Sequence, residues 1–294
     1  MKARGSWLLG LALMCAAALP ASAAEAPTLQ VMSFNLRYAD ERPPHAWSAR
    51  LPLVLETLRR DTPDLVGTQE GLYRQLVDLG RGLPEHDWIG LGREGGSHGE
   101  FMAVFYRRDR LQPLEYDHFW LSDTPATIGS RSWGNRIPRM ASWVRFRDLG
   151  SGCELYVVNT HLDHETADAR RHGARLLLER IDGFEPGIPV LLTGDFNTGP
   201  GDAAAAVDGV HARLTGEGGF VDSWTAAGHD EPGFGSFHDY GGTAKAAGGA
   251  RIDWILARGA LGVRDAAIDT FARDGRYPSD HFPVSARVEL PRCR

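Results

Sequence analysis

Acidic, amide and imidazole side chains border apolar segments at several points of this 294-residue sequence. Asp195 and Asn197 come directly after an apolar run, and Asp280 and His281 come directly before another. Asp and Asn also stabilise turns by bonding their own backbone, so this placement alone identifies no site. Asp253 interrupts an otherwise apolar segment, however, and a buried carboxylate needs a partner. We expect Asp253 to bond His281, which fixes the imidazole tautomer and raises its basicity for acid–base chemistry.

Apolar periodicity around these residues predicts two similar strand–helix–strand units. Strands are predicted at 29–36, 64–70, 155–161 and 190–195, with helices at 51–58 and 169–181. Asn35 and Glu70 are 35 positions apart and His161 and Asp195 are 34 apart, each at the end of a predicted strand. The repeat indicates an internal duplication. Because loops at strand ends carry the chemistry of such folds, these four side chains are predicted to meet at one rim.

The rest of the chain adds further predicted strands and one long irregular segment. Strands are predicted at 101–107, 114–121, 141–147, 251–256 and 282–290, with helical segments at 72–77 and 202–207. The segment Ser122–Arg139 has no usable period and exceeds the usual length of structureless loops. We interpret it as a substrate-facing loop, with a mobile surface segment as the alternative. No break in composition divides residues 24–294, which predicts a single domain.

The first residues have the composition of a secretory leader. Lys2 and Arg4 precede an apolar run at 7–19, and Ala21–Ala23 supplies the small-residue pattern of a cleavage site. The run is shorter than a membrane-spanning helix, which disfavours the alternative of a permanent anchor. Residues 1–23 are therefore predicted to be a signal peptide. The mature protein is expected to be secreted or periplasmic, monomeric and without a transmembrane segment.

Charge and cysteine usage narrow the function classes. The net charge of −6 argues against a broad basic surface for nucleic acid. With 43% hydrophobic and 24% charged residues, the composition is that of a globular protein and disfavours extensive disorder. An oxidising compartment would let Cys153 and Cys293 pair, but the sequence does not show whether their Cα atoms come within bonding distance.

Six short motifs occur together and in this order: Met32–Asn35, Thr68–Glu70, Asn159–His161, Gly194–Asn197, Asp253 and Ser279–His281. In combination they resemble the motif set of the endonuclease/exonuclease/phosphatase superfamily, and the match spans nearly the whole mature chain. The resemblance implies an α/β fold, a four-layer sandwich in which two packed mixed β-sheets are flanked by helices. It also implies hydrolysis of a phosphoester with a divalent cation, usually Mg²⁺ with Mn²⁺ as the alternative, bound where the two halves meet.

The resemblance identifies the type of bond that is cleaved, but it does not identify the substrate molecule that contains this bond. The superfamily includes DNA-repair endonucleases, RNA deadenylases, inositol-polyphosphate phosphatases and sphingomyelinases. The motifs Phe119–Pro125 and Asn159–His164, together with Arg139, resemble a bacterial branch whose substrates are poorly defined. The acidic charge disfavours long nucleic acid, and no basic amphipathic segment suggests membrane binding. We expect a small or extracellular phosphoester as the substrate.

The resemblance implies that three motif residues hold the metal. Glu70 is expected to bind the cation, with Asn35 and Asp280 completing the oxygen-rich shell that suits Mg²⁺. A phosphodiester repels hydroxide, so the reaction also needs an activated water and donors to the phosphoryl oxygens. The resemblance favours Asp195 as the group that orients and deprotonates this water. Matching of pKa alone would favour His281 as the base.

The remaining motif residues are expected to act on the phosphoryl group. Asn197 and His161 would donate hydrogen bonds to its oxygens. His281, held by Asp253, would stabilise the charge that develops there.

Neighbouring polar residues have structural alternatives. Arg139 ends the long loop and could clamp a phosphate with two hydrogen bonds, although an exposed arginine is usually solvated. His238 is a similar candidate for substrate binding. Asp163 is expected to be the N-cap, and His164 a first-turn residue, of the helix that follows. A zinc site using His161 and His164 is the sharper alternative, but no thiolate or third imidazole stands at zinc-ligand spacing.

Two other functions compete with phosphoester hydrolysis. Gly95–Gly99 fits the nucleophile elbow of serine hydrolases, and Ser97, Asp253 and His281 follow the order of their catalytic triad. Such an elbow lies between a strand and a helix, whereas a predicted strand follows here, so a hairpin turn is the better interpretation. The other alternative is a secreted binding protein without turnover, which the full set of candidate catalytic groups disfavours. Metal dependence of hydrolysis separates the three.

Overall fold

The computed structural model describes residues 26–200, 209–291 and 293 and contains two mixed six-stranded β-sheets. The first sheet has the order β11-β12-β1-β2-β4-β3, formed by Gly262–Ile268, Val284–Glu289, Thr28–Asn35, Leu65–Leu72, Glu100–Arg107 and His86–Ile89. The second has the order β5-β6-β7-β8-β10-β9, formed by Leu111–Trp120, Met140–Asp148, Glu154–His161, Val190–Asp195, Asp253–Arg258 and Val221–Asp222. The prediction of two packed mixed sheets is confirmed.

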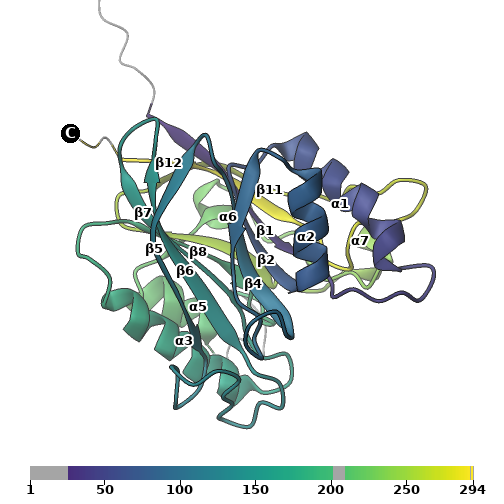
Figure 1. Ribbon diagram of the computed structural model, residues 1–294, viewed down its shortest axis with the longest axis horizontal. Helices are drawn as coiled ribbons and strands as arrows, with labels where there is room; N and C mark the ends of the chain where they lie inside the picture. Colours follow the sequence, from purple (N-terminus) through teal and green to yellow (C-terminus); the bar gives the residue numbers. More distant parts are fainter. Residues whose placement is uncertain (1–25, 201–208, 292, 294) are drawn as a thin grey trace, which may run out of the picture.

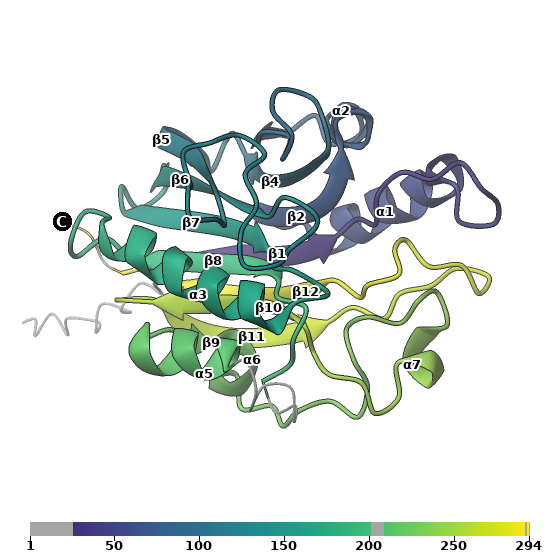
Figure 2. The ribbon, with the colours of Figure 1, turned by 90° about the horizontal axis from the view of Figure 1, so that it is seen from below.

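The helices of the described residues are α1 (Trp47–Asp61), α2 (Tyr73–Gly82), α3 (Ala167–Asp182), α5 (Val210–Ala212), the π-helical turn η1 (Arg213–Glu217), α6 (Ser223–Ala226) and α7 (Gly242–Lys245). α1 and α2 cover the outer face of the first sheet, and α3, α5 and η1 cover that of the second. Figure 1 shows α1 and α2 on one side of the molecule and α3 and α5 on the other, and in Figure 2 the strands lie between these groups. The arrangement is the expected four-layer sandwich.

The strand pairing repeats in the two halves, as the motif spacing predicted. β1 and β2 are parallel, are joined through α1, and are flanked by the antiparallel strands β12 and β4. β7 and β8 are parallel, are joined through α3, and are flanked by the antiparallel strands β6 and β10. Two parallel strands end at the same edge of a sheet, so each half presents two strand ends side by side.

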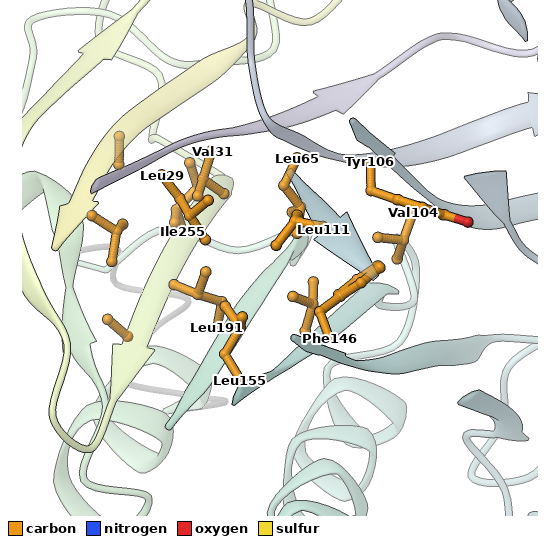
Figure 3. Close-up of a cluster of buried hydrophobic side chains, with 14 of the residues drawn as sticks. Leu29, Val31, Leu65, Val104, Tyr106, Leu111, Phe146, Leu155, Leu191 and Ile255 are labelled. Atoms are coloured by element: carbon orange, nitrogen blue, oxygen red, sulfur yellow. The ribbon is translucent and has the colours of Figure 1, made fainter. Parts of the chain in front are cut away.

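Apolar side chains from both sheets fill the space between them (Figure 3). Those at most 1% exposed include Leu29, Val31, Leu65 and Val104 from the first sheet and Phe146, Leu155, Leu191 and Ile255 from the second. Burial of each such side chain contributes about 1.5–3 kcal/mol relative to its exposure in the unfolded chain. This interior holds the two halves in a fixed relation and thereby fixes the strand ends at which both halves carry polar residues.

Some features of the fold were not expected from the sequence. The edge strands β3, β9 and β11 were missed, because they are short or carry polar residues such as Arg264 and Asp265.

Cys153 and Cys293 form a disulfide bond, with Cα atoms 5.2 Å apart, which settles the pairing that the sequence left open. The expected helix at 202–207 lies outside the described residues. Within the described part of the chain, no helix is both long and apolar enough to span a membrane.

Candidate active site

The ends of the two parallel strand pairs meet at one place. Asn35 ends β1 and Asp195 ends β8, and Asn35 Nδ2 lies 2.9 Å from Asp195 Oδ2. The register of the second sheet pairs Asp195 with His161 of β7 on one side and with Asp253 of β10 on the other. Three polar side chains therefore stand in one row across neighbouring strands. The internal duplication brings this row against the end of β1.

Glu70 reaches the same place because the end of β2 is irregular. The register between β2 and β4 shifts between Thr68 and Gly71, and Glu70, within this bulge, has a φ of 61°. Bulges re-aim side chains, and positive φ in a non-glycine residue persists where its surroundings enforce it. The Glu70 carboxylate accepts hydrogen bonds from Asn35 Nδ2 at 3.1 Å and from the Tyr38 backbone N–H at 3.1 Å. The bulge thus presents Glu70 to the end of β1.

Asp195 is the centre of the polar cluster and is 1% exposed. Besides accepting from Asn35, its Oδ2 lies 3.4 Å from His161 Nε2 and 3.7 Å from His281 Nε2. Burial and the nearby charge of Asp253 raise the pKa of Asp195 to about 7, although the charge of His281 and the hydrogen bonds from Asn35 and Asn197 lower it. A carboxyl group with a pKa near neutrality is suited to accept a proton during a reaction.

His281 is held on two sides. Its Nδ1 lies 2.9 Å from Asp253 Oδ2, which is the contact that the sequence suggested. Its backbone N–H donates to Ser279 Oγ at 3.3 Å, and Ser279 Oγ in turn donates to the Asn35 carbonyl at 2.6 Å. Burial lowers the pKa of His281, but the charges of Asp253 and Asp195 outweigh it and hold that pKa well above its ordinary value. The environment favours the imidazolium.

The cluster can hold a divalent cation. Glu70, Asp195 and His281 each offer a ligand atom, these atoms lie within 4.8 Å of one another, and no other such group occurs among the described residues. Two of the three donors are carboxylates, which Mg²⁺ and Mn²⁺ prefer. The raised pKa of Asp195 shows that negative charge is costly here, and a cation would relieve that cost. The residues therefore fit a divalent metal.

Asn35 and Asp280, the other expected metal ligands, are placed differently from Glu70. Asn35 presents its amide nitrogen to Glu70 and Asp195, while its oxygen accepts the Arg37 backbone N–H at 2.9 Å. Asp280 Oδ2 lies 3.5 Å from Arg37 Nε. In this arrangement Asn35 orients the carboxylates, and a guanidinium balances the charge of Asp280.

His161 and Asn197 stand beside Asp195. Burial, with the charge of Arg139 next in importance, lowers the pKa of His161 well below its ordinary value, so this ring is neutral at pH 7. The Asn197 backbone N–H donates to Asp195 Oδ1 at 3.0 Å, and its Nδ2 donates to the Leu162 carbonyl at 3.0 Å. One amide N–H of Asn197 is then left for a ligand, because the side chain has two.

A cavity of about 380 Å³ opens onto this cluster. The residues expected at the site that line it are Glu70, Arg139, His161, Asp195, Asn197, Asp280 and His281. Asn35 and Asp253 contact these residues from behind. The volume is within the range of small-molecule sites and is formed by residues from both halves of the fold.

Arg139 lies in the cavity wall and is 5% exposed, so it is not the solvated arginine of the alternative interpretation. Its Nη2 lies 2.7 Å from His164 Nδ1, and its Nε lies 3.4 Å from Asp163 Oδ2. Asp163 Oδ1 accepts the backbone N–H groups of Glu165 and Thr166 in the turn before α3, but the N-cap of α3 is Thr166, so the expectation that Asp163 caps the helix and that His164 lies in its first turn was wrong. A guanidinium against His164 disfavours the zinc alternative.

His238 does not line the cavity, contrary to its expected role in substrate binding. The ring is 1% exposed and stacks on Phe282 with ring centroids 3.9 Å apart. Its Nδ1 accepts the Gly242 backbone N–H at 3.3 Å. Burial lowers the pKa of His238 to about 4, so the ring is a neutral packing residue behind the site. Its position one residue after an aromatic in a loop gave no indication of this burial.

Several residues that line the cavity were not predicted: Arg37, Tyr38, Arg93, Glu100, Ile137, His164, Phe237 and Ile252. Arg37 has a φ of 52° and comes two residues after Asn35, so its closeness to the strand-end motif was the signal available. Ile137 and Arg139 show that the end of the long loop faces the cavity, in agreement with the substrate-facing interpretation. Phe237 carried no sequence signal.

The segment Gly95–Gly99 is a hairpin turn and not a nucleophile elbow. Gly92 and His98 donate backbone hydrogen bonds to Gly96 and Gly95, and β4 follows. Ser97 is exposed in this turn and does not line the cavity with His281. The serine esterase interpretation therefore has no support in the structure.

Comparisons with known proteins agree with this geometry. A family model described as "Endonuclease/Exonuclease/phosphatase family" matches residues 32–281. Nocturnin of Drosophila melanogaster is 27% identical over 182 residues, which are 58% of this chain and 26% of Nocturnin. The chain thus spans about a quarter of the length of that curated relative.

Solved structures show the same fold over most of the chain. An endonuclease/exonuclease/phosphatase family protein from Bacteroides thetaiotaomicron is 31% identical, with a TM-score of 0.81, over 90% of this chain and 98% of that one. A mannosyl-6-phosphatase from the same species is also 31% identical, with a TM-score of 0.80, over 89% of this chain and all of the other. Both likenesses extend across both halves of the sandwich.

Proposed function

This chain belongs to the endonuclease/exonuclease/phosphatase family of metal-dependent phosphoester hydrolases, and from that premise we propose that it is a Mg²⁺- or Mn²⁺-dependent hydrolase of small phosphate esters. The observation that carries the proposal is the convergence of Asn35 and Glu70 from one half, and His161 and Asp195 from the other, at one cavity. A binding protein without turnover has no need of this arrangement.

The chain's own residues would hold the cation and the phosphate. Glu70 would bind the metal, with Asp195 within reach and Asn35 orienting the carboxylates. When bound, a divalent cation neutralises phosphoryl charge and lowers the pKa of a nearby water. Arg139 would add a second positive charge from the cavity wall.

Asp195 would accept a proton from the attacking water as the water oxygen bonds to phosphorus. His281 is the poorer base, because Asp253 binds its Nδ1 and the negative Asp195 faces its Nε2, which favours the imidazolium. The imidazolium would instead stabilise the phosphoryl charge, while Asn197 and neutral His161 donate to the nonbridging oxygens. The bond from phosphorus to the ester oxygen then breaks, and that oxygen takes up a proton from solvent water as the alcohol leaves.

A small ester is favoured for two reasons. The cavity of about 380 Å³ matches a compact ligand, and the chain carries a net charge of −6, which disfavours long nucleic acid. The likeness to a mannosyl-6-phosphatase supports a sugar phosphate as the first monoester to test.

The test is a panel of phosphate esters under one Mg²⁺ condition. It compares mannose 6-phosphate, p-nitrophenyl phosphate, bis(p-nitrophenyl) phosphate, inositol phosphates, sphingomyelin, DNA and RNA. We expect the small esters to be hydrolysed fastest, EDTA to abolish turnover, Mg²⁺ or Mn²⁺ to restore it, and a serine-reactive fluorophosphonate to have no effect. Faster hydrolysis of DNA or RNA contradicts the small-ester proposal, and no hydrolysis of any ester contradicts the enzymatic one.

We further propose that the mature protein acts outside the cytoplasm, as a monomer. The leader-like composition of residues 1–23 supports export, and so does the Cys153–Cys293 disulfide, because such bonds persist in oxidising compartments. Cell fractionation with N-terminal sequencing tests export, and light scattering tests the oligomeric state. A cytoplasmic protein that retains its first residues contradicts the export proposal.

A further inference from the structure

Four residues of the cavity wall have no role in the proposed hydrolysis. They are Arg93 from the hairpin before β4, Glu100 at the start of β4, Phe237 from the loop before β10, and Ile137 from the long loop. These residues line the same cavity as the polar cluster. The ester's leaving group must lie in the cavity volume that the phosphate does not occupy.

Arg93 and Glu100 form a two-armed ion pair that lies in this wall. Arg93 Nη1 and Nη2 lie 2.6 and 2.8 Å from the two carboxylate oxygens of Glu100, and the side chains are 11% and 14% exposed. The hairpin fixes the pair, because the Arg93 backbone N–H donates to the Glu100 carbonyl at 3.0 Å. Trp120 Nε1 also donates to the Arg93 carbonyl at 2.7 Å. The pair is built into the wall and is not a solvated surface contact.

The chemistry of this pair selects against a second anion. Arg93 and Glu100 neutralise each other, and Glu70 adds negative charge to the same cavity. The Glu100 carboxyl group still has free lone pairs, and the guanidinium has more N–H groups than the two used. Hydroxyl groups, which both donate and accept, suit such a surface.

Phe237 offers the complementary apolar contact. Its side chain is 45% exposed, lines the cavity, and has its ring centroid 5.1 Å from that of His281. A backbone bridge between Phe237 and His281 holds the ring next to the reaction centre. The C–H bonds on one face of a sugar ring carry partial positive charge and pack well against the negative face of an aromatic ring.

We propose that Arg93, Glu100 and Phe237 form a leaving-group subsite for a hydroxyl-rich ring, so that the preferred substrates are phosphate monoesters of sugars. The inference rests on the proposed function and assigns specificity to residues outside the hydrolytic cluster. Arg93 and Glu100 bind the ring hydroxyls, and Phe237 stacks on the face of the ring. A nucleotide, whose base could also stack on Phe237, is the competing occupant.

The test compares substrates that share the phosphate and differ in the leaving group. The values of kcat/KM are measured for mannose 6-phosphate, p-nitrophenyl phosphate and 5′-AMP with the wild-type chain, Glu100→Gln and Glu94→Gln. The last is a matched control, because Glu94 is on the same hairpin, is exposed, and does not line the cavity. We expect Glu100→Gln to lower the ratio of the sugar value to the p-nitrophenyl value by about 10- to 100-fold, the effect of losing hydrogen bonds to a charged group. Glu94→Gln should keep the wild-type ratio.

The possible results separate the two proposals. An unchanged ratio in Glu100→Gln, an equal fall for all three esters, or a larger fall for 5′-AMP overturns the subsite. If the wild-type chain hydrolyses no ester with Mg²⁺ or Mn²⁺, the proposed function fails, and calorimetric binding of mannose 6-phosphate then decides the subsite. Binding that weakens at least tenfold in Glu100→Gln supports it, and absence of binding overturns it.

Phe237→Leu, which keeps an apolar side chain, should raise KM for the sugar ester more than it lowers kcat, whereas an effect on kcat alone overturns the stacking role.

Discussion

The side-chain nitrogen of Gln69 donates a 2.7 Å hydrogen bond to the side-chain oxygen of Asn159, and this contact joins the two β-sheets. Gln69 precedes Glu70, and Asn159 is two residues before His161. Asn159 Nδ2 also donates to the carbonyls of Thr68 and Ala103, at 2.8 and 3.0 Å. The buried amide therefore fixes the ends of β2 and β7 relative to each other, just where each strand delivers a site residue.

Replacing this amide should both destabilise the fold and impair the site. Asn159→Ala removes the partners of several buried polar groups, and we expect the free energy of unfolding to fall by about 3 kcal/mol or more. Activity should fall as well, because Glu70 and His161 lose their common support. Urea unfolding and kcat measure the two effects. Gln112→Ala, an exposed amide on β5, is the control, and a loss below about 1 kcal/mol in Asn159→Ala contradicts the prediction.

The Asp253–His281 contact should control turnover more than metal binding. Asp253→Asn keeps the shape of the side chain but removes the charge that holds the imidazolium at 2.9 Å. We expect kcat to fall by about 10²- to 10⁴-fold, the usual contribution of a positioned acid–base group. Mn²⁺ affinity, measured by calorimetry, should change little. The control is Asp265→Asn, because Asp265 pairs with Arg287 on the surface. Activity above a tenth of the wild-type value argues against this role.

Replacement of Glu70 should weaken metal binding, in contrast to replacement of Asp253. Glu70→Gln removes a carboxylate from the candidate metal cluster, and we expect calorimetry to show Mn²⁺ affinity at least tenfold weaker. In the wild-type chain, Mn²⁺ at 100 times its dissociation constant should raise the free energy of unfolding by about 2.7 kcal/mol. That gain should shrink in Glu70→Gln at the same Mn²⁺ concentration. Equal stabilisation of both proteins would place the metal elsewhere.

Much of the fold was predictable because both strand–helix–strand units of the duplication have a clear pattern of apolar residues. The strands that carry Asn35, Glu70, His161 and Asp195 at or near their ends are buried, so their apolar runs are long and clear. The edge strands β3 and β11 lack such runs, because β3 is short and Arg264 and Asp265 interrupt β11. The bulge that turns Glu70 into the site was also hidden, because backbone conformation at a strand end depends on the neighbouring strand.

The side chains of the site were predictable only where a motif carried them. Asp195, His281 and Asp253 stand in recognisable contexts, and their convergence follows from the order of the strands. Arg93 and Glu100 face the cavity because a glycine-rich hairpin folds back and pairs them, a tertiary event with no local pattern. His238 is the opposite case. It was expected to bind substrate, but its ring is buried against Phe282.

Glu100 should make stability depend on pH in a defined direction. Burial and the charge of Glu70 raise the pKa of Glu100 from its ordinary value of 4.5 to about 7 in the folded chain. Because folding favours the protonated carboxyl, Glu100 contributes its full stabilisation below pH 4.5. This contribution is lost as the pH rises from 4.5 through 7. Glu100→Gln cannot ionise, so its stability relative to the wild type should improve by up to about 3 kcal/mol between pH 5 and pH 8.5.

The measurement is urea unfolding of both proteins at a series of pH values with EDTA present. Carboxyl groups common to both, such as Asp195 and Asp280, then largely cancel in the difference. Glu94→Gln, on the same hairpin but exposed, should show a difference that does not change with pH. A stability difference between Glu100→Gln and the wild type that is flat over this range, or that moves in the opposite direction, contradicts the prediction.

The Cys153–Cys293 bond should stabilise the chain through its unfolded state. It closes a loop with a sequence separation of 140, and a crosslink of that span restricts the unfolded chain by about 5 kcal/mol in the loop-entropy description. Cys153→Ser with Cys293→Ser should therefore lower the midpoint of thermal unfolding while leaving kcat near the wild-type value, because neither cysteine lines the cavity. Dithiothreitol should lower the midpoint of the wild-type chain and leave the double variant unaffected. A loss of kcat in step with the loss of stability would instead tie the C-terminal segment to the geometry of the site.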